Sequence, residues 1–325
     1  IIFYILFSIL ISSITYGQSK NLFINKTPAH TFSIVARDPE TGEMGVAVQS
    51  HWFSVGTVVS WAEAGVGAVA TQSIVEPAYG PLGLRLMKSG KTAEEALKAL
   101  LSVDPQADYR QVAMVDSRGR VAVHTGKLCI AEAGHTTGNQ FSCQANMMLK
   151  NTVWNAMAKA YQSTEGDLID KLVSALEAAQ SEGGDIRGKQ SAAILVVKPV
   201  STGNIWKDKV IDIRIDDNPE PIKELKRIVH LYRAYNHMNK GDEYLGNNEI
   251  DKALKEYKTA SEMVPENIEM LFWRAETMAA VGKVNESLPL FKTVFEKEPI
   301  WAEFCLLYTS PSPRDLSTSR MPSSA

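Results

Sequence analysis

Cysteine is scarce in this sequence, which has three among 325 residues. No cysteine–histidine spacing indicates a zinc site, and we expect neither a metal nor another cofactor. Cys129 and Cys143 could pair in an oxidising compartment or remain as buried thiols, and the sequence leaves both alternatives open. The third cysteine, Cys305, is the first residue of a C-terminal segment that resembles a sequencing adapter.

An excess of positive charge is also missing. The sequence has 34 lysines and arginines against 37 aspartates and glutamates, for a formal net charge of −3. This balance is ordinary for a soluble protein and lacks the electrostatic footprint of nucleic-acid binding. No strand–loop–helix order around a glycine-rich loop supports nucleotide binding either. We therefore expect no nucleic-acid partner.

Long apolar runs are confined to the start of the sequence. Residues 1–16, IIFYILFSILISSITY, carry no charge but are shorter than the ~20 residues of a bilayer-spanning helix. We interpret residues 1–18 as a secretory signal segment that lacks its start, and 19–30 as a linker or propeptide. The prediction is an exported protein, periplasmic or extracellular, that touches the membrane only through this signal. A retained N-terminal anchor is the alternative.

The C-terminal end of the sequence does not have the pattern of a native fold. Residues 305–325, CLLYTSPSPRDLSTSRMPSSA, show no hydrophobic period and resemble the translation of a transposase-type sequencing adapter. We expect the natural chain to continue past Phe304. The remaining ~285 residues are enough for one substantial domain and a small second one.

Strand and helix patterns come in blocks between residues 31 and 217: strands first, helices next, and strands again. This grouping predicts an α+β domain with helices packed outside two mostly antiparallel sheets, a four-layer α-β-β-α sandwich. The expected strands cover residues 31–36, 45–50, 57–61, 66–72, 109–115, 120–125, 191–197 and 209–216. The expected helices cover residues 81–88, 92–103, 151–162 and 167–182, the second with Thr92 as its N-cap.

A helical repeat follows over residues 222–304. Three residues return 34 positions later: Ala253, Tyr257 and Pro265 recur as Ser287, Phe291 and Pro299. This is the spacing of tetratricopeptide repeats, in which paired helices stack on one another. We therefore predict a small, all-α, tetratricopeptide-like domain that contacts a protein partner.

Thr31 is the first residue of the first expected strand, and it carries a hydroxyl. The strand runs to a turn at Asp38 and returns through a second strand, in the sequence HTFSIVARDPETGEMGVAVQS of residues 30–50. A threonine at a chain start carries its own base, an α-amine of pKa about 8. Thr31 is therefore a candidate nucleophile, and Ser33, on the same strand face, is the second choice. The alternative for Thr31 is a strand-edge threonine chosen for β-propensity.

Other polar residues could serve the same chemistry. Asp38 could position the α-amine, although an aspartate before proline more often forms a turn. Gln49, Ser50 and Gln72 lie at strand ends, where they could bind a substrate amide or donate to an oxyanion. Ordinary hydrogen bonding at strand ends is the alternative for these three.

The remaining candidates lie in three short motifs. His124 and His135 could act as a general acid or contact substrate, or be satisfied structural histidines. Asn146, which we expect next to a helix start, could donate to an oxyanion or cap that helix. Asp185 and Arg187 follow two glycines and could form a loop that binds a carboxylate or phosphate, although a lone glycine-rich loop is weak evidence.

Several segments together resemble the domain-of-unknown-function family 1028 over about residues 31–197. They are TFSIVARDPETGEMGVAVQS, WAEAGVGAVATQS, YGPLGLRLMKSG, HTG, AGHTTG, QANMM and GGDIRGKQSAAILVV. That family is similar in fold to the N-terminal-nucleophile (Ntn) hydrolases, which are α-β-β-α sandwiches. The resemblance implies an amide-bond hydrolase with Thr31 as nucleophile, and we expect its substrate to be a small amide or a peptide. The resemblance itself names no substrate.

One feature departs from the simple family pattern. Ser19 to His30 separate the expected signal cleavage from Thr31, so a free Thr31 amine requires a cut at the His30–Thr31 bond. The alternative function is a non-catalytic periplasmic or extracellular binding protein, with the sandwich holding a ligand and the repeats contacting protein. A cell-envelope scaffold dominated by the repeats is a third reading. Homo-oligomerisation is left open by the sequence.

Overall fold

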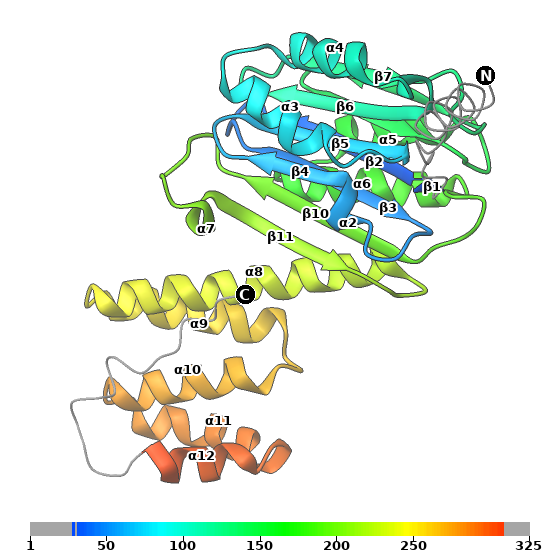
Figure 1. Cartoon of the computed structure of the whole chain (residues 1–325). Coiled ribbons are helices and arrows are strands. Elements are labelled where there is room, and N and C mark those ends of the chain that lie inside the picture. Colours follow the sequence, from blue (N-terminus) through cyan, green and yellow to red (C-terminus); the bar gives the residue numbers. More distant parts are fainter. Residues whose placement is uncertain (1–27, 30, 309–325) are drawn as a thin grey trace, which may run out of the picture. The chain divides into compact units, whose positions relative to one another are not determined.

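The computed structural model describes residues 28–29 and 31–308, which form two compact units that divide between Lys226 and Arg227 (Figure 1). The predicted signal segment, the linker apart from Pro28 and Ala29, and the chain from residue 309 onward lie outside the described residues. The expected α+β class is confirmed. The first unit contains two antiparallel sheets with helices, and the second unit is helical.

The first sheet runs in the order β1-β5-β6-β7, with β4 paired to β5 beside this path. All of its pairings are antiparallel, including the predicted hairpin of its last two strands. Its strands are β1 (Pro28–Ala29), β4 (Ser60–Glu63), β5 (Gly67–Ile74), β6 (Arg110–Asp116) and β7 (Val121–Thr125).

The second sheet runs in the order β11-β10-β3-β2-β9-β8 and is also antiparallel throughout. Its strands are β2 (Thr31–Arg37), β3 (Met44–Ser50), β8 (Gly134–Gly138), β9 (Phe141–Ala145), β10 (Ser191–Val197) and β11 (Lys209–Ile215). Every residue of β10 is buried, as its unbroken apolar sequence predicts.

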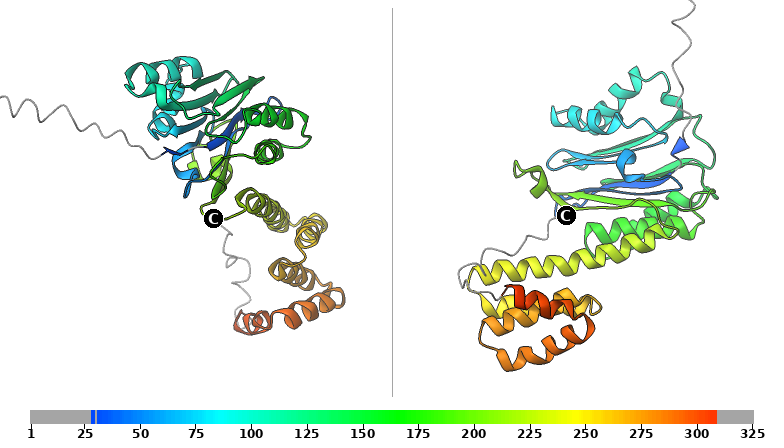
Figure 2. Two further views of the ribbon diagram at one scale, coloured as in Figure 1. Left: turned by 90° about the vertical axis from the view of Figure 1, so that its right-hand side faces the viewer. Right: turned by 60° about the horizontal axis from the view of Figure 1, so that its bottom comes forward.

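The two sheets contact each other mainly through β2, β3, β9 and β10 on one side and β4, β5 and β6 on the other. Helices α3 (Tyr79–Lys88) and α4 (Ala93–Val103) pack on the first sheet. Helices α5 (Val153–Ser163) and α6 (Leu168–Ser181) pack on the second, as the two views of Figure 2 show. Short helices α2 (Gly56–Val59) and α7 (Ile205–Asp208) lie in the connections. Thr92 caps α4 in a full capping box with Glu95, as predicted.

Alternation along the strands divides side chains between the two faces of each sheet. Residues facing the opposite sheet form an apolar core over most of the interface. The main contributors are Val35, Met44, Val46, Val48, Ala68, Ala70, Ala113 and Val115. The outer face of the first sheet forms a separate core with α3 and α4, which includes Val69, Leu84, Leu97, Val112 and Met114.

Two local predictions were wrong or incomplete. The expected strand over 57–61 is instead α2 followed by β4. Val55 and Val59 are both fully buried and stand one helical turn apart, so burial at helical spacing overrides the β-propensity of this segment. The β8–β9 hairpin was not expected, because its first strand, GHTTG, contains small and polar residues and is half-exposed.

The helical unit contains α8 (Pro221–Gly246), α9 (Ile250–Met263), α10 (Ile268–Ala280), α11 (Val284–Lys297) and α12 (Ile300–Tyr308), of which α8 begins in the first unit. Helices α9 and α11 each have 14 residues, and their first residues are 34 positions apart. The recurring pair Ala253 and Ser287 is fully buried at the same place in each. The 34-residue period of the sequence is therefore also the distance along the chain between the first residues of α9 and α11. Among the described residues, no helix combines the length and apolarity needed to cross a membrane.

Candidate functional site

Thr31 lies at the head of β2, on the face directed at the opposite sheet. Its side chain is fully buried, and its register partner on β3 is Ser50, which is also fully buried. The Thr31 carbonyl oxygen accepts the Asn146 backbone N–H at 3.2 Å and the Gln72 Nε2 at 3.0 Å. Asn146 Nδ2 lies 3.5 Å from the same oxygen. The backbone of Thr31 is thus held by groups from both sheets.

Ser33 and two glutamines connect the sheets beside Thr31. The Ser33 hydroxyl donates to Gln72 Oε1 at 2.6 Å and accepts from Gln144 Nε2 at 2.6 Å. All three side chains are fully buried. Both bonding directions of the hydroxyl are therefore taken by amides, which weakens Ser33 as a nucleophile and makes it a bridging residue.

Gln111 is the hub of this network. Its Nε2 donates to the carbonyl oxygens of Ala145 at 2.9 Å and Gly134 at 3.2 Å, and to Thr125 Oγ1 at 3.0 Å. Its Oε1 accepts from Gln72 Nε2 at 2.7 Å and from Asn146 Nδ2 at 2.9 Å. We call the residues Ser33, Gln72, Gln111, Gln144 and Asn146 the amide cluster.

Sequence reasoning did not single out Gln111 or Gln144. Both are glutamines at inward positions of strands that are otherwise buried, and Gln111 is the register partner of Gln72. A glutamine at an inward position of a buried strand was the available signal. Its meaning depends on partners from other strands, which the sequence does not specify.

Of the two predicted histidines, His135 lies at the border of the amide cluster, whereas His124 pairs in register with Val112 on the outer face of the first sheet. His135 Nδ1 is 2.9 Å from Thr125 Oγ1, the hydroxyl that also accepts from Gln111. Burial, and then the nearby His124, lower the pKa of His135, so its imidazole is neutral near pH 7. His124 Nε2 is 2.8 Å from the Ala107 carbonyl oxygen, which fits a satisfied structural histidine.

Asn146 lies next to Thr31, but the helix that we expected to start there is absent. No helix starts beside it: Asn146 follows β9, and the next helix, α5, begins at Val153. The helix-capping alternative fails for the same reason. After Asn146 the chain turns at Met147, which has a positive φ of 56°. The side chain instead donates within the amide cluster.

Asp38 does not fit the role of positioning the Thr31 amine. The seven-residue strand β2 separates the two, a distance of about 20 Å. The Asp38 carboxylate accepts the backbone N–H groups of Glu40 at 2.8 Å and Thr41 at 3.0 Å, and pairs with Lys171 at 3.4 Å. Burial opposes ionisation, but these hydrogen bonds and Lys171 outweigh it and hold the Asp38 pKa below its usual range. Asp38 is a turn residue.

Gln49 and Ser50 point to opposite faces of β3. Ser50 pairs with Thr31 on the inner face, whereas Gln49 pairs with Phe32 on the outer face. Gln49 therefore cannot reach substrate at Thr31, and its predicted role there is wrong. Its carboxamide is fully buried, and neither Nε2 nor Oε1 has a hydrogen-bond partner among the described residues.

Asp185 and Arg187 are paired to each other. Arg187 Nη2 lies 2.7 Å from Asp185 Oδ2, and the same carboxylate accepts the backbone N–H of His51 at 3.1 Å. The loop uses positive φ angles at Gly183, Gly184 and Gly188. Because Asp185 already neutralises Arg187, this loop does not favour binding an anion. It ties the glycine loop to the end of β3 next to Ser50.

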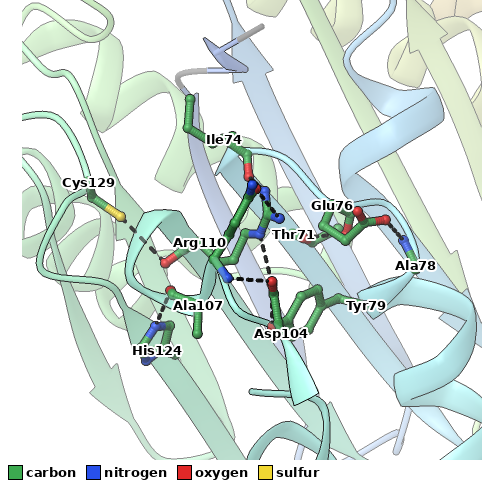
Figure 3. Close-up of polar contacts among 11 residues, drawn as sticks. Thr71, Ile74, Glu76, Ala78, Tyr79, Asp104, Ala107, Arg110, His124 and Cys129 are labelled. Carbon is green, nitrogen blue, oxygen red and sulfur yellow. Dashed lines mark hydrogen bonds and ion pairs between the residues drawn. The ribbon is translucent and has the colours of Figure 1, made fainter. Parts of the chain in front are cut away.

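Arg110 belongs to a second buried polar group (Figure 3). Because Arg110 directly precedes Gln111 on β6, the two side chains lie on opposite faces of the sheet. Arg110 Nε pairs with Asp104 Oδ2 at 2.9 Å, and Arg110 Nη1 donates to the Ile74 carbonyl oxygen at 2.5 Å. Tyr79 donates to Asp104 at 3.0 Å, and burial with this bond raises the Tyr79 pKa. This group anchors the strand end that carries Ser73, a non-glycine residue with a φ of +76°. Sequence reasoning did not identify it.

The two retained cysteines are both free. Cys143 is fully buried and pairs in register with Ile34 on the outer face of the second sheet. Cys129 Sγ donates to the Arg110 carbonyl oxygen at 3.4 Å, and burial raises its pKa (Figure 3). Within residues 28–29 and 31–308, no group of three histidine, cysteine or acidic side chains is arranged to hold a metal.

The family assignment follows from residues 31–225, which match the sequence profile of a family of unknown function, DUF1028. The chain belongs to this family. A DUF1028 protein of known crystal structure, from Silicibacter pomeroyi, is 30% identical, with a TM-score of 0.55, over 62% of this chain and 88% of that one. No match was found among curated protein sequences.

The structure of Anbu (ancestral beta-subunit) from Yersinia bercovieri is more distant. The two chains are 10% identical, and the match covers 61% of this chain and 92% of the Anbu chain with a TM-score of 0.33. A likeness at that level carries no argument about this chain. The amide cluster, Thr31 and the Arg110–Asp104 pair all lie within the matched DUF1028 residues.

A groove of about 590 Å³ lies between α4 and β7 of the DUF1028 unit. Leu97, Leu101 and Val123 contribute to its lining, together with Glu94, Lys98, Ser102, Val121 and Ala122. None of these residues belongs to the amide cluster. The groove and the Thr31 site are therefore different features of the same unit.

Proposed function

We propose that the DUF1028 unit is an Ntn-type amidohydrolase that acts on a small amide or a peptide, with Thr31 as the nucleophile. The observation that carries the proposal is the position of Thr31. It opens a central strand, its side chain lies between two sheets, and amide donors from Gln72 and Asn146 surround its carbonyl oxygen. Helices on both outer faces of the paired sheets support an Ntn-like sandwich.

The chemistry of the amide cluster supports an N-terminal base. Its members are a serine, three glutamines and an asparagine, and none of these side chains accepts a proton near neutral pH. The nearest histidine contact described, His135, reaches the cluster only through Thr125. A free Thr31 α-amine, with a pKa of about 8, would supply the missing base.

The proposed reaction then follows the ordinary steps of acyl transfer. Thr31 Oγ attacks the amide carbonyl carbon while the α-amine takes its proton. Donors such as Asn146 Nδ2, which lies 3.5 Å from the Thr31 carbonyl oxygen and also donates to Gln111 Oε1, stabilise the oxyanion. The amine returns the proton to the leaving nitrogen, and water hydrolyses the acyl ester to regenerate Thr31.

The segment before Thr31 fits a precursor in this scheme. Strand β1 pairs with Ser73 and Ile74 of β5, so the upstream chain is tied to the opposite sheet. An intact His30–Thr31 bond leaves Thr31 without a free amine. Cleavage of that bond, by the protein itself or by another protease, would create the base.

We further propose that the protein is exported and that its helical unit is tetratricopeptide-like and binds a protein partner. The apolar start of the sequence supports export. The 34-residue correspondence between α9 and α11 supports the repeat assignment.

The test is to purify the mature protein, read its N-terminus by mass spectrometry and assay it against a panel of small amides and peptides. We expect a chain beginning at Thr31, partial activity in Thr31→Ser, and at least ~10³-fold lower activity in Thr31→Ala. Thr137→Ala, at an exposed hydroxyl residue of β8, is the matched control. An active protein with an intact His30–Thr31 bond would rule out the mechanism.

A non-catalytic binding protein is the second candidate. Two observations favour it: Thr31 is fully buried in the uncleaved chain, and the groove between α4 and β7 lies elsewhere in the unit. If Thr31→Ala keeps every phenotype of the wild type while Leu101→Asp in the groove abolishes it, this second function is the better one.

A further inference from the structure

The helical unit contains a groove whose charge differs from that of the chain as a whole. It lies between α9 and α10 and has a volume of about 270 Å³. Four of its lining residues are cations, Lys255, Lys258, Arg274 and Lys283, against one carboxylate, Asp251. The complete sequence, in contrast, has a net charge of −3.

Helical spacing brings these cations together. Asp251, Lys255 and Lys258 stand at positions i, i+4 and i+7 of α9, which places them on one stripe of the helix. Arg274 and Met278 stand four residues apart on α10 and form the opposite wall. Lys283, in the turn before α11, lies at one end of the groove.

Most of this charge is not neutralised within the helical unit. Among the described residues, Lys255 and Lys283 form no ion pair, and Arg274 bonds only the Ser261 hydroxyl, at 3.2 Å. Lys258 reaches Glu262 at 3.7 Å, but that pair is exposed and therefore weak. Two other lysines of the unit are paired, Lys252 with Glu249 and Lys292 with Glu296. The groove thus brings together three cations, Lys255, Arg274 and Lys283, that form no ion pair among the described residues.

The shape of the groove indicates which anion it accepts. Its volume lies just below the ~300–1,000 Å³ of pockets that enclose small molecules, so it is suited to a few side chains of a longer partner. Leu254 and Met278 place apolar surface between the cations. A segment that mixes aspartate or glutamate with an aliphatic residue matches both the charge and this surface.

We propose that the groove between α9 and α10 binds an acidic segment of a partner protein, in which carboxylates alternate with aliphatic residues. This site is independent of Thr31 chemistry. Electrostatic attraction sets the rate and specificity of such binding, and the aliphatic contacts limit its release. The interaction is therefore expected to weaken as salt rises.

The experiment measures fluorescence anisotropy of a labelled peptide of Asp, Glu and Leu titrated with the full-length protein. We expect binding that falls at least ~10-fold when salt rises from about 50 mM to about 500 mM, and no binding of the Asn/Gln counterpart peptide. The double variant Lys255→Glu/Lys283→Glu is expected to lose binding at least ~10-fold. Its matched control, Lys240→Glu/Lys292→Glu, makes the same charge change outside the groove and should bind like the wild type.

Several outcomes would overturn the proposal. They are equal binding of the Asn/Gln peptide, equal weakening by the control variant, and failure of the acidic peptide to bind at low salt. Binding of a single-stranded DNA of equal charge as tightly as the peptide would overturn the assignment to protein. Peptide-independent dimerisation that is lost in Lys255→Glu/Lys283→Glu would instead identify a second copy as the occupant. Circular dichroism of each variant separates loss of binding from loss of folding.

Discussion

The layer between the two sheets has two ends that are packed with different chemistry, although the same strands run through both. On β2, Ser33 belongs to the amide cluster and Val35, two residues on, belongs to the apolar core. On β6, the same change occurs between Gln111 and Val115. The apolar end needs only volume and burial. The amide end needs directed hydrogen bonds, so it fixes how the two sheets align and can present donors to a ligand.

The largest effect should come from removing the hub of the amide end. Gln111→Met keeps the length of the side chain but removes the Oε1 that accepts from Gln72 and Asn146, and the Nε2 that donates to the Ala145 and Gly134 carbonyl oxygens. We expect a loss of about 4 kcal/mol in the free energy of unfolding, because each buried unsatisfied group costs about 1–3 kcal/mol. Urea unfolding followed by circular dichroism measures it. A loss below ~1 kcal/mol would show that the cluster does not hold the sheets together.

The apolar end of the layer between the sheets could be predicted from the sequence better than the amide end. Alternating apolar residues around Val35 and Val46 gave the strands and the inner face directly, since burial depends on one strand at a time. The capping box at Thr92 was equally local. Thr31, Ser33 and Gln72 were named as candidates, but their hydrogen bonds depend on register across two sheets, which a strand pattern does not contain.

The failures have the same cause. Gln49 was grouped with Ser50 because both end a strand, yet alternation places the two side chains on opposite faces. Asp38 lies near Thr31 in sequence, but a full strand separates them. Arg110 and Asp104 escaped notice because their pairing links a strand to the loop after α4. Local pattern finds the elements, and long-range pairing decides which polar residues meet.

A second prediction concerns the outer face of the same strand β6, where Arg110 and Asp104 form a buried pair. Asp104→Asn should lower the free energy of unfolding at pH 7 by about 3 kcal/mol, because it leaves a buried guanidinium without its counter-charge. Chemical unfolding of the variant and the wild type at pH 7 measures the difference. If the variant and the wild type have the same free energy of unfolding, solvent already compensates the charge of Arg110.

The pH dependence of that difference has a definite sign. Burial acts to raise the Asp104 pKa, but bonds from Arg110, the Gln106 backbone and Tyr79 hold it below its usual range. The folded protein therefore binds this proton less readily than the unfolded chain, so its contribution is present above the ordinary aspartate pKa of about 3.9 and is lost as pH falls below that value. The gap between wild type and Asp104→Asn should narrow between about pH 4 and pH 2. A gap that widens in acid would contradict the pairing.

A smaller effect is expected at the apolar end. Val115→Ala removes two buried methyl groups from the inner face of β6 and should cost about 2 kcal/mol. Because Val115 and Gln111 share one strand and one face, the pair of variants compares hydrophobic with amide packing directly. If Val115→Ala costs more than Gln111→Met, hydrophobic burial dominates at both ends and the contrast between them is weaker than the hydrogen bonds indicate.

The smallest effect, with the opposite sign, is expected at the other fully buried glutamine, Gln49. Its amide atoms have no partner among the described residues, and on α6 the Gln180 carboxamide oxygen has none either. Gln49→Met removes two unsatisfied polar atoms while conserving volume, so we expect the protein to become more stable by about 1 kcal/mol. The measurement is the same urea titration used for Gln111→Met. The two variants make the same substitution, so they compare a glutamine that has hydrogen-bond partners with one that has none among the described residues. A loss of stability instead would show that a bound water or ligand satisfies Gln49, and that the space between β3 and α6 is a second polar site.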